Sequence, residues 1–390
     1  MDNIHNLVSP YKIDSIRVST PNDAFGRLRV SNPYTMFDSQ SRYVQNDNWY
    51  SNITGNGYTT YMSNESSVYM TTSTLANSQV VRETKYVFQY QPGKSLLIMN
   101  TVVMGAPKSN LVQRVGYFGQ DNGIYVESTN TGYYLVKRNN GTETRVEQRL
   151  WNGITLVNIL DLTKSQIFWM DIEWLGVGSV RCGFVLDSQM MVCHTFRHSN
   201  YVDYAYIGTA CLPCRYEIFN TGTTTSNSTM KQICSTVISE GGYEPNNKLY
   251  IQSNTATLAT AGVIYPVISI KLKPTNLDAI VRIEKVDVLV TTAGNTQWYI
   301  TRNSGLTGNS FVSHPTSQLV LCDTASTAMT DGKLLNSGLV STKSSDTFGF
   351  TTGIVYQLGR SLGVSDTLTL SVEGDGKNTS AQVILAWSEM

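Results

Sequence analysis

Residues 166–175 read QIFWMDIEWL, and this stretch decides the fold class. Its large apolar side chains recur at every second position, namely Phe168, Met170, Ile172 and Trp174. Successive side chains of a β-strand point to opposite faces, so a period of two is typical of a strand with one face in a core. The stretch therefore predicts a strand over 166–175.

Other strands with the same pattern are predicted before and after it. The first series includes an apolar run at 96–104, strand–turn–strand patterns at 116–127 and 133–150, and a hairpin at 179–197. Short strands separated by turn residues are typical of a β-sandwich or jelly roll.

A second series of strands begins after residue 243. In it, residues 368–372 are predicted to face 383–387 across a hairpin closed by 374–378. Further strands are predicted at 267–272, 281–290, 297–301 and 317–321.

The turn-rich segment EGGYEPNN, residues 240–247, separates the two series. We therefore predict an all-β protein with three parts. These are an extended N-terminal arm over 1–45, a jelly-roll-like β-sandwich over 46–242 and a second, smaller β-sandwich over 243–390.

Composition excludes several classes of protein. The chain has 390 residues, with 29 basic and 29 acidic side chains, so it lacks the basic surplus of a nucleic-acid coat. The sequence contains no run of 18 apolar residues, so no transmembrane helix is predicted. The first residues lack a basic segment followed by an apolar run, so we expect no signal peptide and reduced cysteines. Only 15% of residues are charged, against about 25% in ordinary domains.

The odd positions of the same strand carry Trp169, Asp171 and Glu173. They resemble the catalytic strand of laminarinase-type glycoside hydrolases, whose pattern is Glu-X-Asp-X-Glu. That chemistry needs two carboxyl groups about 5 Å apart, and Trp169 stands where the nucleophile belongs. We therefore expect no hydrolysis. Two interpretations stay open: a glycan-binding face made by the three residues, or a strand whose odd residues face a partner strand or solvent.

A second set of residues imitates a zinc site: His194 and His198, followed by Cys211 and Cys214. The histidines lie in a predicted strand, where residues four apart are about 13 Å from each other. A zinc ion would need the strand to end after His194. We therefore expect no metal or other cofactor, and favour buried, reduced thiols.

The N-terminal segment offers residues for docking. Two interpretations of residues 1–45 stay open: a strand and loops lying on the first domain, or an arm that binds a neighbouring subunit. For the arm, we predict burial of the apolar side chains and pairing of the arginines against a neighbour. The docking residues are Phe25, Arg27, Leu28, Arg29 and Val30.

Two segments resemble a group of virion proteins of tailed bacteriophages, frequent in marine and cyanobacterial phages. One is DAFGRLRVSNP, residues 23–33, and the other is DLTKSQIFWMDIEWLG, residues 161–176, with shorter matches at 37–39, 216–218 and 234–242. The resemblance implies a structural part of the particle. It brings no catalytic residues.

These observations together predict a non-enzymatic structural component of a virion, in the tail, the baseplate or the capsid decoration. The expected location is the virion, assembled in the host cytoplasm. The expected partners are other virion proteins and copies of the chain, with a trimer favoured by analogy and no nucleic acid or membrane. The alternative is a carbohydrate-binding or receptor-binding module that uses a jelly-roll scaffold to bind a host surface glycan.

Overall fold

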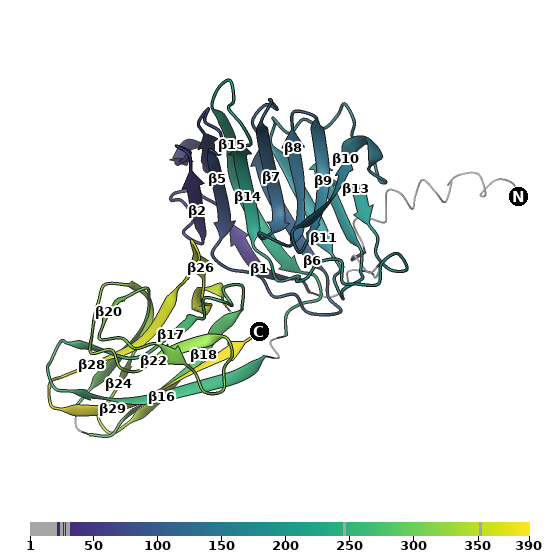
Figure 1. Ribbon diagram of the computed structural model, residues 1–390. Coiled ribbons are helices and arrows are strands. Elements are labelled where there is room, and N and C mark those ends of the chain that lie inside the picture. Colours follow the sequence, from purple (N-terminus) through teal and green to yellow (C-terminus); the bar gives the residue numbers. More distant parts are fainter. Residues whose placement is uncertain are drawn as a thin grey trace, which may run out of the picture. The chain divides into compact units, whose positions relative to one another are not determined.

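The computed structural model describes residues 22, 23, 26, 28, 32–244, 247–292, 294–350 and 353–390 (Figure 1). These residues form 29 β-strands and three short 3-10 helices, so the prediction of an all-β protein is confirmed. The chain divides into two compact units, Met1–Glu244 and Pro245–Met390. No helix among the described residues is long and apolar enough to cross a membrane.

The first unit is a jelly-roll-like sandwich of two antiparallel sheets. The seven-stranded sheet has the order β10-β9-β8-β7-β14-β5-β2. Its strands are β2 (Trp49–Thr54), β5 (Gln79–Thr84), β7 (Leu111–Phe118), β8 (Gly123–Thr129), β9 (Gly132–Asn139), β10 (Thr142–Glu147) and β14 (Cys214–Asn220).

The eight-stranded sheet has the order β13-β12-β11-β6-β15-β4-β3, and β1 pairs with β15. Its strands are β1 (Tyr34–Ser39), β3 (Tyr58–Met62), β4 (Ser67–Thr72), β6 (Leu96–Val103), β11 (Gln166–Ile172), β12 (Val180–Leu186), β13 (Gln189–Phe196) and β15 (Ser228–Ser239).

The predicted strand over 166–175 is β11, which ends at Ile172. Phe168, Met170 and Ile172 are fully buried, as the period of two predicts. Tyr216 of the seven-stranded sheet is also buried, and its hydroxyl lies 3.0 Å from Ser235 Oγ of the opposite sheet. Alternate residues of both sheets therefore fill one core between them.

The predicted N-terminal arm ends earlier than residue 45. Residues 34–39 form β1, which pairs antiparallel with β15. Phe37 is buried and packs against Phe88 and Trp49, with ring centroids 5.1 Å and 6.0 Å away. The alternative expectation, a strand lying on the first domain, describes these residues, because Phe37 completes the core of that domain.

The second unit is a smaller sandwich. Its four-stranded sheet has the order β16-β29-β18-β25, and its six-stranded sheet has the order β21-β22-β17-β28-β19-β24. Two short ribbons, β20 with β23 and β26 with β27, complete it. The bounds are β16 (Lys248–Leu258), β17 (Ile264–Leu272), β18 (Val281–Val290), β19 (Thr296–Arg302), β20 (Gly305–Thr307), β21 (Val312–Ser313), β22 (Val320–Asp323), β23 (Ala328–Thr330), β24 (Lys333–Val340), β25 (Ser345–Gly349), β26 (Arg360–Ser361), β27 (Val364–Ser365), β28 (Thr367–Gly374) and β29 (Thr379–Glu389).

The predicted hairpin between 368–372 and 383–387 is wrong. β28 pairs with β17 and β19, whereas β29 pairs with β16 and β18, so the two strands lie in different sheets. Leu370 and Leu385 nevertheless belong to one buried cluster. Both side chains therefore belong to the core between the two sheets, and the chain passes from one sheet to the other between β28 and β29.

Candidate functional site

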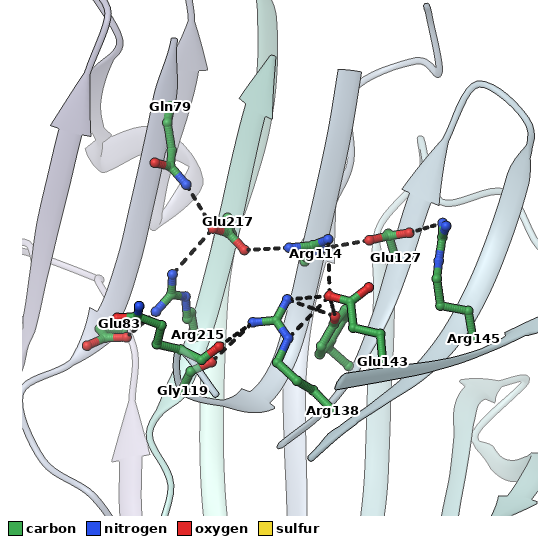
Figure 2. Close-up of polar contacts among 12 residues, drawn as sticks. Gln79, Glu83, Arg114, Gly119, Glu127, Arg138, Glu143, Arg145, Arg215 and Glu217 are labelled. Atoms are coloured by element: carbon green, nitrogen blue, oxygen red, sulfur yellow. Dashed lines mark hydrogen bonds and ion pairs between the residues drawn. The ribbon is translucent and has the colours of Figure 1, made fainter. Parts of the chain in front are cut away.

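The outer face of the seven-stranded sheet carries a continuous network of ion pairs, shown in Figure 2. We call it the charged face. Six neighbouring strands contribute to it, in the sheet order β5, β14, β7, β8, β9 and β10. Its members are four arginines and four glutamates: Arg114, Arg138, Arg145, Arg215, Glu83, Glu127, Glu143 and Glu217.

Strand register places opposite charges directly across from one another. Arg114 of β7 stands opposite Glu217 of β14 on one side and Glu127 of β8 on the other. In the same way Glu83 stands opposite Arg215. Residues opposite each other on antiparallel strands have Cβ atoms about 5 Å apart, so these side chains meet without further adjustment.

Arg114 is the centre of the charged face. Its Nε donates to Glu127 Oε2 at 2.7 Å, and its Nη1 lies 3.5 Å from Glu217 Oε2. The side chains of Glu127 and Glu217 are only 2% and 6% exposed. Burial alone would lower the pKa of the Arg114 guanidinium, but Tyr125, Glu217 and Glu127 outweigh burial and raise it. Arg114 therefore stays charged and compensates two carboxylates that have little access to water.

Glu143 lies at the rim of the charged face. Arg138 Nη2 donates to Glu143 Oε1 at 2.6 Å, and the Tyr125 hydroxyl donates to the same oxygen at 2.7 Å. Burial alone would raise the pKa of this carboxyl, but these two hydrogen bonds and the charge of Arg114 outweigh it and lower the pKa. Glu143 is therefore ionised at neutral pH.

A cleft of about 510 Å³ lies over one part of the charged face. Arg114, Glu127, Glu143 and Arg145 line it, together with Phe219 and with Ser, Thr and Asn side chains. A general acid needs a carboxyl group that keeps its proton near neutral pH. Each glutamate in this cleft is instead paired with arginine, so the arrangement favours a rigid, charge-balanced surface over acid catalysis.

The lowered pKa of Glu143 predicts a pH dependence of stability. The carboxyl binds a proton more readily in the unfolded chain than in the folded protein, so its contribution is present above about pH 4.5 and is lost as the pH falls through the folded pKa. We expect the difference in unfolding free energy between wild type and Glu143→Gln to shrink between about pH 6 and pH 3. Urea denaturation of both proteins across this range measures it; a constant difference would contradict the assignment.

The strand that resembles a glycosidase does not form an open face. Trp169 and Asp171 are fully buried, and Arg181 Nη2 donates to Asp171 Oδ2. Glu173 is half-buried beyond the end of β11, and burial raises its pKa. The burial contradicts a glycan-binding face made by Trp169, Asp171 and Glu173. β11 lies between β6 and β12 within its sheet, and six of its seven residues are buried.

The residues that imitate a zinc site do not come together. His194 lies on β13 of one sheet and Cys214 on β14 of the other. His198 stacks on Tyr206 with ring centroids 3.9 Å apart, and burial lowers the pKa of both histidines to about 4. Within the described ranges, no three His, Cys, Asp or Glu side chains form a group that could hold a metal. Cys211 therefore belongs to no such group.

Only one predicted docking residue lies in the described part of the chain. Leu28 is 66% exposed and forms a bridge with Asn22, whose carbonyl accepts from Arg181 Nη2 at 3.2 Å. Docking through this segment stays a prediction. The other four residues, Phe25, Arg27, Arg29 and Val30, lie outside the described residues.

β16 is the longest edge strand among those described. Its eleven residues pair with β29 in unbroken register, and no described strand pairs with its other edge, where His314 lies 3.2 Å from the Ile251 carbonyl. Leu249 and Ile251 are 62% and 64% exposed, and Lys248 is the one charged residue of the strand. By contrast, the edge strand β13 is covered by backbone hydrogen bonds from Gly153 and Ile154. A long, weakly charged edge with two exposed apolar side chains is a template for pairing with another strand.

Comparison with known proteins identifies fold likenesses only. No family model matches the chain, and no curated protein matches it. Among solved structures, an endo-β-1,4-glucuronan lyase from the fungus Trichoderma reesei is 12% identical, with 52% of this chain and 95% of that chain covered and a TM-score of 0.35.

Two further structures are similar to the same degree. A prokaryotic β-1,3-1,4-glucanase (lichenase) from a mouse hindgut metagenome is 12% identical, with 52% and 99% of the two chains covered and a TM-score of 0.35. Peanut lectin is 11% identical, with 54% and 98% covered and a TM-score of 0.32.

Proposed function

We propose that this chain is a non-enzymatic structural component of a tailed-bacteriophage virion, in the tail, the baseplate or the capsid decoration, and that it acts by subunit–subunit docking. The observation that carries the proposal is the edge of β16 with which no described strand pairs, together with the exposed Leu249 and Ile251. The resemblance of residues 23–33 and 161–176 to virion proteins supports it. The low content of charged residues is consistent with a surface that is covered after assembly.

A second copy of the chain is the partner that we propose for β16. β25 is the opposite edge of the same four-stranded sheet, and it carries Asp346 and the 40% exposed Phe348. Phe348 matches the exposed apolar Leu249 and Ile251 of β16, which share one face of that strand. Head-to-tail pairing of β16 with β25 of the next copy generates a ring when the rotation between copies closes, and a trimer is the state that we favour.

Mass spectrometry and immunogold labelling of purified particles test the role. We expect the chain in mature particles at a fixed copy number, with the label at one location on the particle. A chain that is present in infected cells and absent from mature particles would contradict a structural role in the virion.

Carbohydrate binding is the second candidate, and the polar clefts of the first unit favour it. The site cannot be the strand with Trp169, because that side chain is buried. A glycan array separates the two candidates: a docking protein binds no glycan, whereas a receptor-binding module binds a restricted set of related glycans.

A further inference from the structure

We propose that a second cleft of the first unit binds a sugar that carries a carboxylate group. This inference rests on the carbohydrate-binding candidate and is independent of docking through β16. The cleft has a volume of about 340 Å³, near the lower limit for small-ligand sites. The β9–β10 hairpin supplies Lys137, Asn139, Thr142 and Thr144, and the segment after β13 supplies Tyr204 and Tyr206.

Lys137 is the group that would bind the carboxylate. Its ammonium group has no Asp or Glu oxygen within 4.0 Å among the described residues, and the lining contains no acidic side chain. Burial lowers its pKa. A cation that is partly removed from water without a counter-ion gains strongly from an anionic ligand.

Tyr206 provides a rigid ring beside Lys137. The Tyr206 ring is buried and stacked on His198, its hydroxyl donates to the Glu173 carbonyl at 3.0 Å, and Lys137 Nζ lies 5.9 Å from the ring centroid. The ammonium group therefore lies beside a rigid aromatic ring, at the outer limit of a cation–π contact.

The rest of the lining suits a sugar ring. Tyr204 is 55% exposed, so its ring can pack against the apolar C–H face of a sugar. Thr142 and Thr144 are exposed, and their hydroxyls can both donate to and accept from sugar hydroxyls. Bidentate recognition of a phosphate group uses arginine forks, which this lining lacks, whereas an ammonium group pairs with a carboxylate as a point charge.

The first cleft lacks this unbalanced charge. There Arg114 and Arg145 are paired with Glu127 and, for Arg114, also with Glu143. An anionic ligand would have to displace these carboxylates. The cleft at Lys137 requires no such exchange, so we assign the ligand to it.

Calorimetric titration of the full chain with galacturonate and with galactose tests the site. The two sugars differ at the carboxylate, so galacturonate is expected to bind about tenfold more tightly or better. Lys137→Met and Tyr204→Ala are each expected to weaken galacturonate binding about tenfold. Lys164→Met and Tyr201→Ala, which change exposed side chains outside the lining, are matched controls that should leave binding unchanged.

Three results would overturn the proposal: equal affinity for the two sugars, no galacturonate binding up to about 10 mM, or equal effects of Lys137→Met and Lys164→Met. If Lys137→Met does not fold, the galacturonate affinities of Tyr204→Ala and Tyr201→Ala test the site instead. Both tyrosines are exposed, so neither substitution should prevent folding. A glycan array on which binding is unaffected by Lys137→Met would overturn this site and retain carbohydrate binding at another. Incorporation of the chain into particles should be the same for all four variants.

Discussion

Replacing Arg114 by methionine is expected to lower the free energy of unfolding by about 3–5 kcal/mol. The guanidinium compensates Glu127 and Glu217, whose side chains are only 2% and 6% exposed. Methionine retains most of the apolar volume and removes the charge. Glu127 then keeps only Arg145 and Glu217 keeps only Arg215, and the loss of a buried counter-ion costs more than the loss of an exposed pair.

Guanidinium chloride denaturation of wild type and variant measures this effect. Arg149→Met is the matched control, because Arg149 is 73% exposed and its pair with Glu147 should contribute about 0–1 kcal/mol. Adding Glu127→Gln and Glu217→Gln to Arg114→Met should recover part of the loss, because the two buried positions are then neutral and Arg145, which loses Glu127, is 42% exposed to water. A loss below about 1 kcal/mol for Arg114→Met would show that water compensates the glutamates.

Two lysines at the exposed positions of β16, Leu249→Lys and Ile251→Lys, are expected to convert the assembled chain to a monomer of 43.2 kDa. Both side chains point to solvent in the single chain, so the sandwich should keep its melting temperature. The added charges would have to be buried against β25 of the next copy. Charged side chains on an edge strand prevent this kind of pairing.

Multi-angle light scattering gives the mass of each protein. Leu362→Lys is the control, because Leu362 is 60% exposed in the same unit and lies between β26 and β27, away from the four-stranded sheet in the strand order. It should leave the oligomer intact. A wild-type chain that is monomeric, or a double variant that stays assembled, would contradict pairing through β16.

The fold class and most strand positions could be predicted from the sequence. The predicted strand over 281–290 coincides with β18, and 96–104 and 166–175 overlap β6 and β11. The alternation of apolar and polar side chains is a local property, fixed by the two-residue repeat of extended backbone. Each strand therefore carries in its own residues the face that it buries.

The charged face could have been suspected from the same alternation. Arg215 and Glu217 occupy alternate positions of one strand, as Glu143 and Arg145 do in another. The sequence does not say, however, that Glu217 stands opposite Arg114. That pairing depends on which strands become neighbours, and β14 and β7 are about a hundred residues apart in the chain.

The sequence by itself thus determined an all-β protein, its strands and the buried face of most of them. Only the tertiary structure decided the strand partners, and it places 368–372 and 383–387 in different sheets instead of in one hairpin. It also decided the burial of Phe37 and of Trp169. The physical reason is that alternation reports one strand's exposure to a core. Which strand lies beside it, and what covers its second face, depends on packing between segments far apart in the chain.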